Sequence, residues 1–111
     1  MTVLVVIAHP DKNSFTQSWA AESIRSATVL GHEVLVSDLY QMQFDPIEKA
    51  DHYKVTFPGD HFDVLKTQEF HSQKDSLPSE VKVELNKIKK CDLIVFHFPL
   101  WWFSPPSALK G

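Results

Sequence analysis

Two short segments of the chain are apolar almost without interruption. Residues 3–8 read Val-Leu-Val-Val-Ile-Ala, and residues 93–98 read Leu-Ile-Val-Phe-His-Phe. Because neither segment alternates apolar with polar positions, each predicts a strand that is covered on both faces, as in the middle of a parallel sheet. Pro99 follows the second segment and has no backbone N–H, so it is expected to end that strand.

Hydrophobic residues at helical spacing predict a helix that begins at about Ser14. The sequence Ser-Phe-Thr-Gln at 14–17 has the spacing of a capping box, in which the serine hydroxyl accepts the N–H of Gln17 and the glutamine side chain reaches back. Gly31 favours the end of this helix. The apolar positions that share one face are Phe15, Trp19, Ala20, Ile24 and Ala27. Residues 32–39 then predict a short strand parallel to the first.

A second helix is predicted after Pro78, since proline is tolerated in the first turn of a helix. Its apolar face is formed by Val81, Leu85 and Ile88. The charged positions expected to face solvent are Lys82, Glu84, Lys87 and Lys89. This helix leads the chain into the apolar strand that begins near residue 92.

Three strands connected through helices predict an α/β fold with a parallel sheet in the spatial order 2-1-3. In that order the carboxyl ends of the first and third strands lie side by side. The turn at residues 9–14 and the bend at residues 99–103 would then flank one crevice. Open α/β sheets bind their ligands at such a place.

The turn after the first strand suits an anion such as a phosphate. A helix start offers free backbone N–H groups and the positive end of the helix dipole, and His9 can donate beside it. The hydroxyl and amide side chains nearby are Asn13, Ser14, Thr16 and Ser18. No glycine-rich phosphate loop is present. The alternative is that these side chains only cap the helix.

The bend after the third strand is aromatic, with Trp101, Trp102 and Phe103 in succession. Flat apolar faces at the carboxyl end of a strand suit a planar ring system. The alternative is that the cluster anchors the next helix. The histidines show no spacing typical of a metal site, and no serine lies in a Gly-x-Ser-x-Gly elbow, so neither a metal centre nor Ser-His-Asp catalysis is expected.

Composition narrows the class of protein further. A chain of 111 residues is expected to form a single domain over 1–111, and a net charge of −3 without a long basic block argues against binding to nucleic acid. The single cysteine, Cys91, suits a reducing compartment. The apolar runs are too short for membrane insertion, and no secretory signal is recognised, so a cytoplasmic location is expected.

Two motifs far apart in the chain carry a resemblance to a known family. The first is Ala-His-Pro-Asp-Lys-Asn-Ser-Phe at 8–15, followed by a helix, and the second is Phe-Pro-Leu-Trp-Trp-Phe-Ser-Pro-Pro-Ser-Ala-Leu-Lys-Gly at 98–111. A chain with both is similar to the NAD(P)H:quinone oxidoreductases, also called the DT-diaphorase family, which have a flavodoxin-like fold. The second motif is highly specific, and the resemblance covers essentially the whole chain.

The resemblance implies a flavin between the two bends, FAD or alternatively FMN, with NAD(P)H as co-substrate. Family members pass a hydride from NAD(P)H to the flavin and then to a quinone, and they work as homodimers. The positions matching the phosphate part are His9, Asn13, Ser14, Phe15, Thr16 and Ser18. Those along the ring are Pro99, Leu100, Trp101, Trp102 and Phe103, of which Trp102 and Phe103 also match substrate-binding positions. Asp63 loosely matches a polar residue near the adenine half.

The family continues well past the Leu-Lys-Gly at the end of this sequence. The 111 residues are therefore expected to be the amino-terminal part of a flavodoxin-like domain, with one sheet face incompletely covered. The family's residues that assist hydride transfer to the quinone have no counterpart in the sequence. An alternative from another class is a flavodoxin-like flavin-binding or regulatory subunit without turnover. A flavodoxin-type electron carrier is disfavoured, because the aromatic bend suits the stacking of two rings.

Overall fold

The computed structural model describes residues 1–46, 68, 69, 72, 77–101 and 103–110. The elements are β1 (Thr2–Ile7), α1 (Phe15–Val29), β2 (Glu33–Asp38), α3 (Ser79–Lys90), β3 (Leu93–His97) and α4 (Ser107–Lys110). The strands form a parallel sheet in the order β2-β1-β3. The predicted order 2-1-3 and the predicted strands are therefore confirmed, with bounds shifted by one or two residues.

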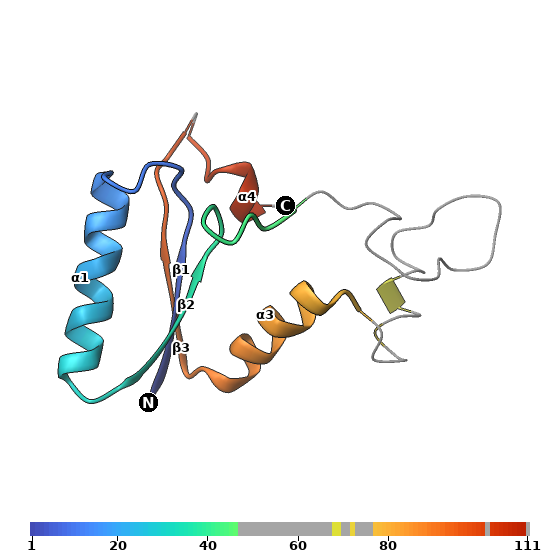
Figure 1. Ribbon diagram of the computed structural model, residues 1–111, viewed down its shortest axis with the longest axis horizontal. Helices are drawn as coiled ribbons and strands as arrows, with labels where there is room; N and C mark the ends of the chain where they lie inside the picture. The colour runs from blue at the N-terminus through green and yellow to red at the C-terminus, as the bar shows by residue number, and fades with distance from the viewer. Residues whose placement is uncertain (47–67, 70–71, 73–76, 102, 111) are drawn as a thin grey trace.

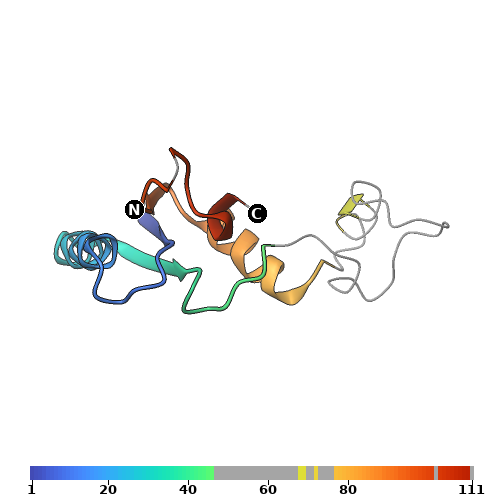
Figure 2. The same ribbon diagram turned by 90° about the horizontal axis from the view of Figure 1, so that it is seen from above.

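Helices cover both faces of this sheet (Figure 1). On one face, Val3, Val5 and Ile7 of β1 form a buried cluster with Ala20 of α1. The neighbouring residue Leu4 is also buried and lines a small pocket with residues of α3 and α4. Figure 2, turned by 90°, again shows α1 and α3 apart on either side of the strands. β1 is thus covered on both faces, as its uninterrupted apolar sequence predicted.

The amino-terminal cap of α1 is only half of the predicted capping box. Ser14 Oγ accepts the backbone N–H of Gln17 at 3.2 Å, as predicted. The side chain of Gln17 does not reach back, however, but donates to Asp38 Oδ2 at 3.1 Å at the end of β2. The reason is that the backbone N–H of Ser14 is already bonded to the carbonyl oxygen of Asp11 at 3.1 Å. Gln17 therefore links the start of α1 to the sheet.

The carboxyl end of α1 confirms the predicted stop at Gly31. This residue has φ +86°, a left-handed conformation that glycine adopts without a steric penalty. Its N–H bonds the carbonyl of Thr28 at 3.0 Å, and the N–H of His32 bonds that of Ala27 at 3.0 Å. This pair of bonds is a Schellman motif, which turns the chain directly into β2.

The orientation of α3 differs from the prediction that its charged residues face solvent. Glu84 and Lys87 are partly buried, with side chains 17% and 22% exposed. Ser37 of β2 is 1% exposed, and its hydroxyl donates to Glu84 Oε2 at 2.6 Å while accepting from Lys87 Nζ at 3.1 Å. A buried hydroxyl requires hydrogen-bond partners. This requirement rotates the polar side of α3 toward the sheet, which hydrophobic spacing alone does not predict.

The third strand is less covered than its sequence predicted. In the described part of the chain β3 pairs only with β1, and Leu93 and Phe96 are 48% and 51% exposed. The prediction that this strand is covered on both faces is therefore wrong for these residues. The expectation of an incompletely covered sheet agrees with their exposure. No described helix has the length and apolar character needed to cross a bilayer.

Candidate functional site

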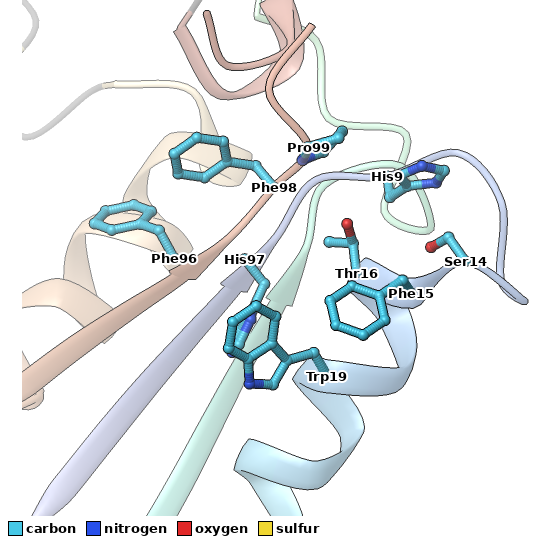
Figure 3. A pocket seen from close by; sticks show the side chains of 9 residues that line it. All are labelled: His9, Ser14, Phe15, Thr16, Trp19, Phe96, His97, Phe98 and Pro99. Atoms are coloured by element: carbon cyan, nitrogen blue, oxygen red, sulfur yellow. The ribbon is translucent and has the colours of Figure 1, made fainter.

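A cleft of about 530 Å³ lies at the carboxyl end of the sheet, between the start of α1 and the end of β3. Its volume is within the range of about 300–1,000 Å³ that ligand sites occupy. Figure 3 shows the side chains that line it: His9, Ser14, Phe15, Thr16, Trp19, Phe96, His97, Phe98 and Pro99. The strand order thus brings the turn after β1 and the end of β3 into one crevice, as predicted.

The conformation of the first turn fixes the hydrogen position on His9. Nδ1 of His9 accepts the backbone N–H of Asp11 at 2.9 Å. A neutral imidazole carries a single hydrogen, so this hydrogen is on Nε2. The ring of His9 lies edge-on to Trp101, with centroids 5.8 Å apart and planes at 64°. The turn therefore offers a ring N–H donor next to the aromatic bend.

The start of α1 adds two backbone donors. None of the hydrogen bonds in the described part of the chain uses the N–H of Phe15 or Thr16, which are the first two residues of the helix. The hydroxyls of Ser14 and Thr16 line the cleft beside them. Free N–H groups at a helix start, together with the helix dipole, favour an anion. This part of the cleft suits a phosphate.

Two of the predicted phosphate contacts lie elsewhere. Asn13 is exposed and does not line the cleft, and its backbone N–H bonds Asp11 Oδ1 at 2.9 Å. Ser18 is also exposed and does not line the cleft. Of the hydroxyl and amide side chains predicted for this site, only Ser14 and Thr16 reach it.

The aromatic bend is a tight reversal of the chain after β3. The backbone N–H of Trp101 bonds the carbonyl of Ser104 at 2.9 Å, and the N–H of Ser104 bonds that of Trp101 at 3.0 Å. Phe103, at the tip, is 100% exposed and has φ +60°, a conformation that is unfavourable for a residue with a side chain. A strained, fully exposed aromatic residue is typical of a binding site.

The other predicted ring contacts are spread around this bend. Pro99 lines the cleft, whereas Leu100 is 73% exposed and does not line it. Trp101 is 41% exposed and borders the cleft through its contact with His9. The remaining two predicted residues, Trp102 and Asp63, lie outside the described residues.

Sequence reasoning missed two residues that line the cleft, Trp19 of α1 and His97 of β3. The rings of His97 and Trp19 point toward each other (Figure 3), with centroids 5.8 Å apart. His97 Nε2 is 3.0 Å from Ser23 Oγ on α1. Burial lowers the pKa of His97 below its ordinary value, which keeps the imidazole neutral at pH 7. The signals available were a lone histidine in an apolar strand and a tryptophan one helical turn after Phe15.

Phe96 and Phe98 line the same cleft from the opposite side of β3. In Figure 3 both rings point away from α1, because successive side chains of a strand alternate between faces. The sequence placed them in the strand and assigned them no role at the site. Among the residues that the structure describes, no group of three or more His, Cys, Asp or Glu side chains could hold a metal ion.

Comparison with known protein families shows which family the chain belongs to. A family profile described as the flavodoxin-like fold matches residues 1–111. The chain belongs to this family. The described elements form a parallel sheet in the order 2-1-3, with a cleft at its carboxyl end between the start of α1 and the end of β3.

Relatives of this flavodoxin-like chain are named as quinone oxidoreductases, which confirms the resemblance drawn from the two motifs. The ribosyldihydronicotinamide dehydrogenase [quinone] of Mus musculus is 37% identical over 98% of this chain and 48% of its own length. NAD(P)H dehydrogenase [quinone] 1 of Cavia porcellus is 33% identical over 97% of this chain and 40% of its own length. The chain thus spans somewhat less than half of these curated relatives.

Solved structures give the same relationship. A putative quinone reductase from Klebsiella pneumoniae superposes with a TM-score of 0.95 at 32% identity, over 99% of this chain and 42% of that protein. The NAD(P)H:quinone oxidoreductase from Methanothermobacter marburgensis superposes with a TM-score of 0.77 at 26% identity, over 99% of this chain and 50% of that protein. The chain therefore follows the fold of part of each.

Proposed function

We propose that the protein is a flavin-dependent NAD(P)H:quinone oxidoreductase. The observation that carries this proposal is the cleft in which anion donors at the start of α1 meet the aromatic bend after β3. A flavin nucleotide has a phosphate and a flat ring system, and it needs both kinds of surface at a short distance. The names of the relatives, which include NAD(P)H and quinone, support the reaction.

The residues present fit a flavin phosphate at the first turn. The Nε2–H of His9, the free N–H groups of Phe15 and Thr16, and the nearby hydroxyls would donate to its oxygens. Charge-assisted hydrogen bonds of this kind are stronger than those between neutral groups. The donors are already held in place by the cap of α1, so binding requires little ordering of the chain.

The bend at residues 99–103 would hold the ring. Pro99 and Trp101 would provide apolar contacts along it, and Phe103 would shield the face on which a nicotinamide or quinone stacks. Trp102 belongs to the same proposed contact by sequence. A bound flavin supplies the redox chemistry, since it can accept a hydride from NAD(P)H and deliver it to a quinone. The chain's own residues bind, orient and shield.

The finer assignments are also proposals. FAD is proposed as the flavin, with FMN as the alternative, and Asp63 as a contact of its adenine half. A homodimer is proposed because the exposed residues of the aromatic bend, Phe103 above all, would then be covered by a second copy. A cytoplasmic location fits a protein that reduces small diffusible acceptors.

Two measurements on the purified protein test this function. The protein should be yellow, or become so on incubation with FMN or FAD, and the extracted cofactor can be identified by its mass. With flavin bound, it should oxidise NADH or NADPH when a quinone is added. A protein that stays colourless with both flavins contradicts the proposal. One that binds flavin but oxidises neither nucleotide with any quinone would instead be the binding or regulatory subunit.

Trp102→Ala tests how the aromatic bend acts. If the bend positions the nicotinamide or quinone, turnover should fall more than flavin affinity does. Steady-state kinetics and flavin titration of the same sample give both quantities. Equal losses would indicate that the tryptophan only anchors the flavin ring.

A further inference from the structure

His9 is held in the cleft by residues that lie outside it. Its ring lines the cleft (Figure 3), and its Nδ1 accepts the backbone N–H of Asp11 at 2.9 Å. Its backbone carbonyl accepts a second bond, at 3.4 Å, from the side-chain amide of Gln17. His9 is therefore fixed at two points, one on the ring and one on the main chain.

Asp38 sets the direction of the Gln17 amide. Its Oδ2 accepts from Gln17 Nε2 at 3.1 Å, and its Oδ1 accepts the backbone N–H of Gln41 at 3.2 Å. The sheet fixes the position of Asp38, because this residue pairs with Ile7 in the register of β2 and β1. A bond to a carboxylate is stronger than one between neutral groups, so it orients the amide. The second amide hydrogen is then available to the carbonyl of His9.

Gln17 and Asp38 are separated from the ligand cleft by His9. Neither residue lines the cleft, and both line a second cavity of about 90 Å³. Among the residues that the structure describes, only His9 lines both cavities. Apart from the long-range effect of the Asp38 charge, any influence of this pair on a bound anion must therefore pass through His9 or through the start of α1.

The carbonyl of His9 belongs to the peptide that leads the chain toward Asp11. This peptide is planar, and the ring of Pro10 fixes the φ of the next residue. A bond to the carbonyl therefore restricts where the backbone N–H of Asp11 points, and this N–H is the group that occupies His9 Nδ1. With Nδ1 as an acceptor, the hydrogen of the neutral ring is on Nε2. The contacts of Gln17 thus bear on both the position and the tautomer of the His9 ring.

We propose that Gln17 and Asp38 are positioning residues, which hold His9 with its Nε2–H available to a phosphate at the start of α1. This inference rests on the proposed function in taking the phosphate to be that of a flavin. Without the Gln17 amide the His9 ring is free to change its direction and its tautomer. Binding then has to order the ring, and a donor that is ordered beforehand gives the higher affinity.

Gln17→Met tests the inference in titrations with FMN and with riboflavin, which has the ring but no phosphate. Methionine has a similar length and no amide, and the cap of α1 is kept because Ser14 Oγ bonds the backbone N–H of residue 17. The Kd for FMN should rise about tenfold, the lower end for one hydrogen bond to a charged group, and that for riboflavin should change by less than about twofold. Gln41→Met, the same exchange at an exposed residue that reaches Asp38 through its backbone N–H, is the control. Equal losses for both flavins, or an unchanged Kd for FMN, would overturn the inference.

A second pair of variants shows through which group each residue acts. If Gln17 acts through His9, Gln17→Met should weaken FMN no further in a His9→Leu background. A further loss of about tenfold there would assign the effect to the start of α1 and overturn the inference. Asp38→Ala should also weaken FMN relative to riboflavin, because the Gln17 amide loses its orientation. Tighter binding of FMN would instead show that Asp38 acts by its negative charge, and would overturn its role as a positioning residue.

NMR of the His9 ring nitrogens separates failure of this inference from failure of the proposed function. With the ring neutral, the natural protein should show a protonated Nε2 and an acceptor Nδ1, and Gln17→Met should show a mixture of the two tautomers. If the protein binds neither flavin, the oxidoreductase proposal fails, and this measurement then decides the role of Gln17 alone. The same single tautomer in Gln17→Met as in the natural protein would overturn the inference.

Discussion

The two bends that border the cleft are built in opposite ways. The turn after β1 is held by its own hydrogen bonds, from Asp11 N–H to His9 Nδ1 and from Ser14 N–H to the Asp11 carbonyl. The bend after β3 is held by one pair of backbone bonds between Trp101 and Ser104 and carries its rings outward. The first has polar groups with defined positions, and the second has apolar surface without a cover.

This difference indicates that the two bends would bind different parts of one ligand. A phosphate gains most from donors that need no reorganisation, which the first turn supplies through the cap of α1. A flat ring gains from apolar surface that becomes covered, which the exposed bend supplies. Changes that remove the cap or the packing of the first bend should therefore lower stability together with binding, and changes in the second should affect binding alone.

Ala20→Leu should have the largest effect on stability, because it acts on the support of the first bend. Ala20 is fully buried between α1 and β1, so a larger side chain must push the helix away. Overpacking of this kind costs about 1–3 kcal/mol in the free energy of unfolding. Urea denaturation measures the cost, and flavin affinity should fall with it. Ala21→Leu, at an exposed position of the same helix, should change neither by much.

Substitutions of Ser14 separate its two roles in the first bend. Ser14→Ala removes the hydroxyl that accepts from Gln17 and should cost about 1 kcal/mol of stability. Ser14→Asp keeps a good cap but brings a negative charge to the phosphate, so thermal stability should be nearly preserved while FMN affinity falls. Ser18→Ala, outside the cleft, is the control. If Ser14→Asp binds FMN normally, the phosphate does not lie at this turn.

Phe103→Gly tests the second bend. The φ of +60° costs about 1–2 kcal/mol for a residue with a side chain, whereas glycine adopts it freely but loses more entropy on folding. Since the ring is fully exposed, the melting temperature should be unchanged or slightly higher, while turnover falls. Phe103→Ala keeps the strain and should lose turnover without the gain. A clear loss of stability in both variants would contradict the view that this bend acts in binding alone.

The smallest effect is expected from pH, through His97. Burial lowers its pKa from the ordinary 6.5, so below that value the unfolded chain binds a proton more readily than the folded one. Its contribution to stability is therefore complete above about pH 6.5 and is lost as the pH falls through the lower folded value. His97→Gln should make the pH dependence of stability shallower between pH 7 and pH 5. Parallel curves for the two proteins would contradict this.

The sequence predicted the strand order and the place of the cleft because few arrangements of three apolar strands and two helices are possible. It also placed Ser14 and Gly31 correctly, since caps depend on neighbours in the chain. It did not show that Trp19 and His97 would meet. Their contact depends on how α1 lies across β3, which no local pattern encodes.

Prediction was weakest where a side chain's surroundings come from another element. Glu84 and Lys87 were predicted to face solvent. In the structure both side chains hydrogen-bond the buried hydroxyl of Ser37. Asn13 was predicted as a phosphate contact by residue type, and in the structure it is exposed and its backbone N–H bonds Asp11 Oδ1. In each case the residue type was informative, and the direction of the side chain was set by partners distant in sequence or by the local fold.

The central claim is that both bends hold one flat ligand with a phosphate, and riboflavin tests it most directly. Calorimetric titration of the protein and of Ser14→Asp and Trp101→Leu with FMN and with riboflavin, which has the ring without the phosphate, assigns each bend its part. We predict that FMN binds more tightly than riboflavin, that Ser14→Asp weakens FMN alone, and that Trp101→Leu weakens both. Equal affinities for FMN and riboflavin, unaffected by either substitution, would contradict the account.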